Sequence, residues 1–105
     1  MFARQVTLKL KVDSLAEFPI IIENNVLPLL RRQKGFRDEI TLLNTELSEA
    51  IGISLWDTKE DAEVYNRTGY PEVAKALSEV LIGTPTVQVF EVANSTFHKV
   101  IAKTA

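Results

Sequence analysis

The 105-residue sequence contains no cysteine and only one histidine. A disulfide framework, a thiol nucleophile and a cysteine-ligated zinc site are therefore excluded within one chain. The 12 basic and 14 acidic residues leave a net charge of −2, so the strong positive charge typical of nucleic-acid binders is missing. The sequence also lacks the apolar core of a secretory signal and any run near the roughly 20 apolar residues that span a bilayer. We expect a cytoplasmic protein that binds neither nucleic acid nor membrane.

The composition is that of one soluble globular domain, with 46% hydrophobic and 25% charged residues. A chain of this length buries roughly 60 to 68% of its unfolded surface, which is enough for one core and too little for two. We predict a single domain over residues 1–93 and a C-terminal tail over 94–105. The tail fits a helical turn about as well as an extended strand, so its conformation stays open.

The first half of the chain reads as a strand followed by a bent helix. Alternating apolar residues predict a strand over Val6–Val12. The segment Ser14–Glu17 has the spacing of a capping box, which predicts the start of a helix. We expect Pro28 to bend this helix and Gly35 to end it in a left-handed conformation.

The second half predicts two strands, a broken helix and a last strand. The strands are Phe36–Leu43 and Glu49–Trp56, which form a hairpin. The helix is capped by Thr58–Asp61, is interrupted at Thr68–Pro71 and leads to a strand over Thr86–Val92. The complete order of elements predicts an α+β, ferredoxin-like βαββαβ sandwich, with both helices on one face of an antiparallel sheet.

Alternation within each strand assigns side chains to the two faces of this sheet. The helix-covered face receives an aliphatic set: Val6, Leu8, Leu10, Ile51, Ile53, Leu55, Val87 and Val89. The bare face receives a mixed set: Gln5, Thr7, Lys9, Lys11, Thr41, Leu43, Gly52, Ser54, Trp56, Gln88, Phe90 and Val92. A face this apolar is unfavourable in water, so we predict a homodimer. The paired sheets either line a cavity for a small organic ligand or form an interface only, and both remain open.

Three segments carry a resemblance to a known family: Val26–Phe36, Leu55–Tyr65 and Gly69–Val73. Together they resemble the antibiotic biosynthesis monooxygenase domain family over roughly residues 2–93. The resemblance implies a homodimeric α/β barrel with a pocket in each subunit between its sheet and helices. Some members oxygenate aromatic polyketide substrates without metal or flavin, so the resemblance leads us to expect no cofactor.

The resemblance also implies roles for particular residues. In the cofactor-free members a tryptophan at the end of the third strand and an upstream asparagine serve the pocket. Trp56 matches the tryptophan, whereas Gly52 stands at the position of the asparagine. A branch of similar proteins degrades heme with a histidine on the second helix and a further tryptophan. This chain has no histidine there, and Tyr65 stands at the second tryptophan position, so heme degradation is disfavoured.

The candidate substrate-binding residues combine aromatic rings, cations and a hydroxyl: Trp56, Tyr65, Tyr70, Arg67, Lys9, Ser54 and Phe90. An indole can stack on an aromatic ligand, a phenol can donate to a bound oxygen atom, and Arg67 can attract an enolate-like oxygen. We assign no catalytic residue. The only imidazole, His98, is interpreted as a surface residue of the tail. Clustered carboxylates at a helix start are stabilised by its dipole, so we predict no metal site.

Two functions from different classes remain. The first is a small-molecule enzyme: an oxidoreductase of the cofactor-free monooxygenase type, or a related isomerase or cyclase. It would deprotonate and orient an aromatic or quinol-like substrate and exclude water. The second is a non-catalytic dimeric module that binds a metabolite or a protein. A polar cavity with aromatic walls favours the enzyme, and a cavity filled by Phe90, Trp56 and Leu43 favours the module.

Overall fold

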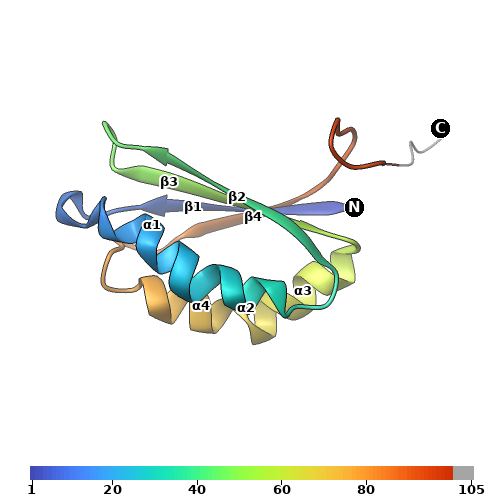
Figure 1. The fold of residues 1–105 in the computed structure, drawn as a ribbon, viewed down its shortest axis with the longest axis horizontal. Helices are drawn as coiled ribbons and strands as arrows, with labels where there is room; N and C mark the ends of the chain where they lie inside the picture. The colour runs from blue at the N-terminus through green and yellow to red at the C-terminus, as the bar shows by residue number, and fades with distance from the viewer. Residues whose placement is uncertain (101–105) are drawn as a thin grey trace.

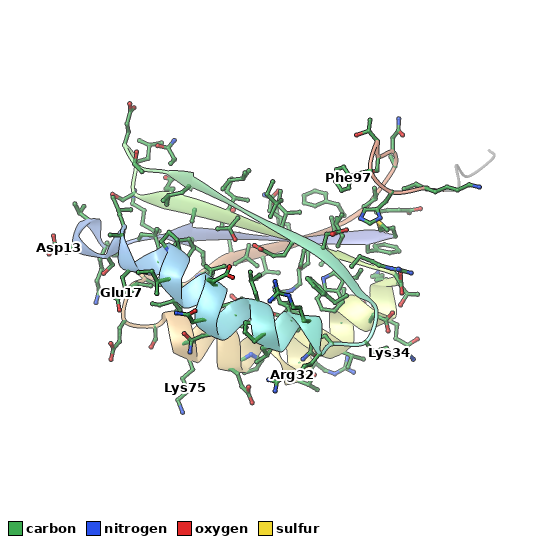
Figure 2. All side chains as sticks on the ribbon, viewed as in Figure 1. Asp13, Glu17, Arg32, Lys34, Lys75 and Phe97 are labelled. Carbon is green, nitrogen blue, oxygen red and sulfur yellow. The ribbon has the colours of Figure 1, made fainter. Side chains whose placement is uncertain are left out.

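The computed structural model describes residues 1–100. The end of the expected tail, residues 101–105, lies outside the described part of the chain. Within residues 1–100 no helix is long and apolar enough to cross a membrane. Figure 2 shows charged side chains on the outer side of the helical layer, among them Arg32 and Lys75, which point away from the sheet.

The four strands form one antiparallel sheet in the order β2-β3-β1-β4. Their bounds are Phe2–Lys9 for β1, Phe36–Asn44 for β2, Glu49–Trp56 for β3 and Thr86–Glu91 for β4. The helices of the described chain all lie on one side of the sheet, and the other side is largely uncovered (Figure 1). This α+β arrangement with two crossovers is the ferredoxin-like fold that the order of elements predicts.

The first crossover consists of short helical pieces that follow one another directly. They are the 3₁₀ turn η1 (Val12–Ser14), the helix α1 (Glu17–Ile21), the π-helical turn η2 (Ile22–Val26) and the helix α2 (Leu27–Arg31). The first strand lies nearer the N-terminus than the predicted Val6–Val12. It ends at Lys9, and a 3₁₀ turn begins at Val12.

Pro28 distorts this crossover as expected, through the π-helical turn that precedes it. A proline ring clashes with the carbonyl group four residues earlier and has no N–H group to bond it. The chain widens instead, and the Leu27 amide donates to the carbonyl oxygen of Ile22, five residues back. The predicted capping box is wrong, because α1 begins after Ala16 and no side chain caps it.

The second crossover is the broken helix predicted from the sequence. It consists of α3 (Lys59–Thr68) and α4 (Tyr70–Leu77), separated at Gly69. The hydroxyl of Thr58 accepts a hydrogen bond of 3.0 Å from the Asp61 amide, so the expected N-terminal cap is present.

The predicted faces of β2 and β3 are wrong. Val6 pairs with Gly52 and Gly52 pairs with Thr41, so the three positions share one face. All three line the space between the sheet and the helices. Ser54 and Trp56 have the same parity as Gly52, and they therefore lie on the helix-covered face, where both are buried.

The open face carries Ile51, Ile53 and Leu55, the β3 residues that alternation assigns to the core. The apolar residues of the open face are five aliphatic ones and one aromatic one: Ile40, Leu42, Ile51, Ile53, Leu55 and Phe90. Ile40 is 54% exposed and Phe90 is 48% exposed, so this face remains apolar, although with different residues than expected. For β1 and β4 the predicted faces are confirmed, since Val6 pairs with Val87.

Candidate functional site

A cavity of about 60 Å³ lies between the sheet and the helices. Much of its wall is apolar, including Val6, Leu8, Phe18, Ile22, Val26 and Leu30. Polar side chains come from the sheet and from the break between α3 and α4: Arg4, Glu39, Thr41, Ser54, Tyr65 and Tyr70. An apolar enclosure with a few polar groups is typical of ligand sites, although these usually have about 300 Å³ or more. The cavity admits a few water molecules, and an aromatic ligand must widen it.

Arg4 is the only buried charged side chain among the described residues and is 2% exposed. Its Nη2 donates to Oδ1 of Asn66 at 2.8 Å. The guanidinium carbon lies 4.1 Å from the ring centroid of Tyr70 and 5.2 Å from that of Tyr65, which allows cation–π attraction. The Nε–H group is buried without a hydrogen-bond partner. Burial lowers the pKa of Arg4, an effect that the two tyrosines oppose.

Glu39 brings a carboxyl group to the cavity from β2. The hydroxyl of Thr41 donates a hydrogen bond to Oε1 of this carboxyl. Burial raises the pKa of Glu39, and the hydrogen bond from Thr41 opposes this effect. The group therefore retains its proton to a higher pH than an exposed glutamate does.

Trp56 lies behind the cavity wall and is completely buried. Its ring stacks on Tyr65, and its indole N–H donates to Oγ of Ser54 at 2.9 Å. Burial raises the pKa of Tyr65 to about 12, and the nearby Arg4 opposes this shift. The Tyr65 hydroxyl consequently stays protonated near neutral pH and can donate a hydrogen bond to a ligand.

Four of the seven candidate binding residues gather at this site. Ser54, Tyr65 and Tyr70 line the cavity directly, and Trp56 contacts it through Tyr65. Sequence reasoning had placed Ser54 and Trp56 on the bare face, which is the error in strand parity described above.

The other three candidates lie away from the cavity. Arg67 is exposed on α3. The ammonium group of Lys9 donates to the backbone carbonyl of Leu47 at 2.9 Å and pairs with Glu49 at 3.7 Å. Phe90 lies on the open face, as expected, and does not line the cavity.

Sequence reasoning missed Arg4 and Glu39. The sequence pattern predicts a first strand from Val6, whereas β1 begins at Phe2 and places Arg4 on the same side as Val6 and Leu8. An arginine among core-facing positions of a strand is the signal that could have revealed it. Glu39 lies on the same face of the sheet as Thr41, because the two are two residues apart in β2. Its position in the cavity could be predicted only with the correct face assignment for β2.

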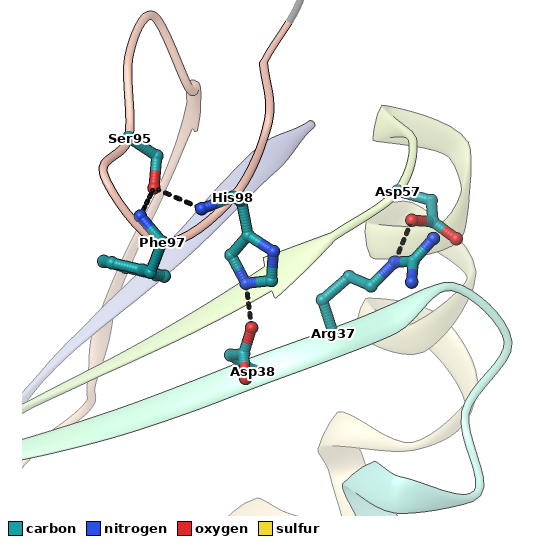
Figure 3. A network of polar contacts seen from close by, with 6 residues as sticks. All are labelled: Arg37, Asp38, Asp57, Ser95, Phe97 and His98. Atoms are coloured by element: carbon teal, nitrogen blue, oxygen red, sulfur yellow. Dashed lines mark hydrogen bonds and ion pairs between the residues drawn. The ribbon is translucent and has the colours of Figure 1, made fainter.

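The tail after β4 lies over β3 and β2 on the open side of the sheet (Figure 3). Phe97 and Leu55 line one shallow surface hollow. The hydroxyl of Ser95 accepts hydrogen bonds from the amides of Phe97 and His98, at 3.2 and 3.1 Å. The His98 ring contacts the carboxylate of Asp38 on β2. The only histidine is therefore engaged on the sheet surface, away from the cavity.

These features define a ferredoxin-like α+β domain with a partly polar cavity under its helices. No protein-family model matches the chain, and no curated protein matches its sequence. Solved structures do share the fold. A Nitrosomonas europaea protein that carries the name antibiotic biosynthesis monooxygenase matches with a TM-score of 0.73 and 14% identity, covering 90% of this chain and 100% of its own.

Two Streptomyces enzymes are similar to the same extent. A monooxygenase of Streptomyces coelicolor in complex with nanaomycin D has a TM-score of 0.75 and 16% identity, covering 93% of this chain and 92% of its own. SnoaB, a cofactor-independent oxygenase from Streptomyces nogalater, has a TM-score of 0.72 and 16% identity, covering 90% of this chain and 95% of its own. The chain has the fold of the antibiotic biosynthesis monooxygenases, which confirms the resemblance predicted from its sequence.

Proposed function

We propose that this domain binds an aromatic or quinol-like compound in its cavity and acts on it as a cofactor-independent monooxygenase. The observation that carries the proposal is the convergence of the Glu39 carboxyl with the hydroxyl groups of Ser54, Tyr65 and Tyr70 in one apolar enclosure. The fold supports it, because SnoaB is a cofactor-independent oxygenase and the Streptomyces coelicolor monooxygenase holds nanaomycin D.

In this proposal Glu39 is the general base. Its carboxylate accepts a proton from an activated methylene or phenol, and the resulting electron-rich anion reduces O₂. For a methylene between two rings, CH₂ plus O₂ becomes C=O plus H₂O, with one oxygen atom in the product and the other in water. Burial raises the pKa of Glu39, which makes its carboxylate a stronger base than that of an exposed glutamate.

The remaining residues of the cavity position the substrate. The hydroxyl groups of Tyr65 and Tyr70 donate hydrogen bonds to the oxyanion that develops on deprotonation. The apolar wall excludes water from the reactive anion. Phe90 and Leu43 do not line the cavity and Trp56 lies behind its wall, so these residues do not fill it, which supports the enzyme over the non-catalytic module.

The experiment that tests this function is oxygen uptake with anthrone as probe, followed by mass spectrometry of the product formed under ¹⁸O₂. We expect incorporation of one labelled atom above the rate without protein. Glu39→Gln should lower kcat at least about 100-fold, since a general base contributes that much. Glu46→Gln, in the exposed hairpin turn, is the matched control and should retain full activity. Binding of nanaomycin D without oxygen uptake from anthrone or a naphthoquinol would instead identify a binding module.

We also propose that the open face pairs with a second copy of the chain. Ile40, Leu42 and Phe90 are exposed apolar residues on that side of the sheet. A monomer exposes this surface to water, and a symmetric dimer buries it.

A further inference from the structure

Arg4 has an unusual electrostatic environment. Side chains with a charge are rarely buried without an ionic partner, because removing a charge from water is costly. Within the described chain, no carboxylate lies within the 4.0 Å that would make an ion pair with Arg4. Its Nη2 donates to the neutral amide of Asn66, and its buried Nε–H group has no hydrogen-bond partner. Within the described chain the positive charge therefore has no carboxylate partner, and one donor has no acceptor.

Among the described residues of the cavity wall, Glu39 is the only acidic one, and it forms no ion pair with Arg4. Arg4 pairs with Ser54 on β3, and Ser54 pairs with Glu39 on β2. Two strand intervals separate the Cα atoms of Arg4 and Glu39, which corresponds to about 10 Å. Arg4 and Glu39 thus lie on the two strands that flank Ser54, and both residues line the cavity.

We propose that Arg4 is the anion-binding residue of this cavity, and that its ligand is a small aromatic compound with one anionic oxygen, a carboxylate or a phenolate. The proposal rests on the proposed function only in placing a small molecule in the cavity, and it requires no turnover. The free Nε–H group donates to the anionic oxygen, and the charge of the ligand neutralises the guanidinium. The ring of the ligand lies against Val6, Phe18 and Leu30 of the apolar wall.

In this proposal Arg4 is the cationic residue of the site. The candidate named from the sequence, Arg67, is exposed and does not line the cavity. The rings of Tyr65 and Tyr70 both contact the guanidinium group, with their centroids 5.2 and 4.1 Å from its carbon. Arg4 is thereby held in position before a ligand enters, which reduces the entropy lost on binding.

The test compares a charged ligand with its neutral isostere. Binding of 2-naphthoate and of 2-naphthamide is measured by isothermal titration calorimetry under argon. We expect the wild-type protein to bind the carboxylate at least about tenfold more tightly than the amide, since a hydrogen bond to a charged group has this effect. Arg4→Met should abolish the preference while still binding the amide. Arg37→Met removes one exposed arginine that pairs with Asp57 outside the cavity (Figure 3), and it should leave the preference unchanged.

A second probe distinguishes the two sources of anionic oxygen. 4-Nitrophenol is coloured only as its phenolate, and a cation that binds the phenolate lowers the apparent pKa of the ligand. If the ligand class is phenolate, wild-type protein increases the absorbance of 4-nitrophenolate in weakly acidic buffer and Arg4→Met does not. If it is carboxylate, only the naphthoate preference is observed. Either response supports the proposal.

Several results would overturn it. Equal binding of naphthoate and naphthamide would refute the anion site and leave the proposed function intact. Binding of neither ligand, with no response from 4-nitrophenol, would refute both. A lower melting temperature of Arg4→Met with an unchanged preference would make Arg4 a structural residue. If Arg4→Met does not fold, Arg4→Lys keeps the charge and loses the Nε–H group, and it should bind naphthoate more weakly with some preference retained.

Discussion

Trp56 stacks on Tyr65 with their ring centroids 4.9 Å apart and their planes inclined by 27°. The pair joins the end of β3 to α3, and Phe36 and Tyr70 extend it by edge contacts at 5.6 and 6.4 Å. Trp56 is the only tryptophan of the chain, so its fluorescence reports on this cluster alone. Because Tyr65 and Tyr70 line the cavity, the cluster connects the ligand site with the stability of the fold.

The hydrogen bond from Trp56 to Ser54 gives a first prediction. Ser54→Ala leaves the buried indole N–H without its partner, and we expect a loss of about 1–3 kcal/mol in the free energy of unfolding. The measurement is urea unfolding followed by Trp56 fluorescence. Ser78→Ala removes an exposed hydroxyl that bonds only the Lys75 carbonyl, and it should change stability by less than about 0.5 kcal/mol. Equal effects of the two substitutions would contradict the prediction.

Two glycines with left-handed backbone give a matched pair. Gly35 has a φ of 79° and Gly83 a φ of 72°. A Cβ atom at Gly35 would overlap the Asp61 side chain, whereas one at Gly83 meets open space. Gly83→Ala should therefore show only the conformational cost, about 1–2 kcal/mol, and Gly35→Ala a larger loss. Thermal unfolding of both variants measures the difference, and a smaller loss for Gly35→Ala would show that the contact with Asp61 is wrong.

The raised pKa of Tyr65 predicts how stability falls in alkaline solution. The folded pKa is about 12 and the ordinary value is 10.0, so the folded state holds the proton more tightly. The stabilising contribution of protonated Tyr65 is complete below pH 10. It is lost as the pH rises towards 12, because in this range Tyr65 ionises in the unfolded chain and stays protonated in the folded one. Unfolding free energies at increasing pH should fall less steeply for Tyr65→Phe than for the wild type. Parallel curves would mean that Tyr65 is not the group responsible.

The apolar open face predicts a dimer that one charge disrupts. Ile40 is 54% exposed in the centre of β2, and Ile40→Glu places a carboxylate within the proposed interface. We expect sedimentation velocity to show a dimer for the wild type and a monomer for this variant. Val12→Glu is the control, since Val12 is 71% exposed in η1, outside the sheet. A monomeric wild-type protein would remove the argument for pairing.

Local signals in the sequence determined where most elements lie. The strand Glu49–Trp56 has the predicted bounds, and the break of the second helix falls at Gly69. The bend before Pro28 and the left-handed Gly35 also follow from the chemistry of single residues. These features depend on residues close together in the chain, so they can be predicted from the sequence alone.

The tertiary structure alone decided which side of each strand meets the helices. Alternation establishes that Ile51, Ile53 and Leu55 share a face, but exchanging the two faces leaves a period-two pattern unchanged. Pairing of Gly52 with Val6 resolves the choice and turns Ser54 towards the helices. The cavity follows from this choice, because strands distant in sequence bring its polar groups together. The sequence by itself thus determined the elements and their order, and long-range strand pairing determined the site.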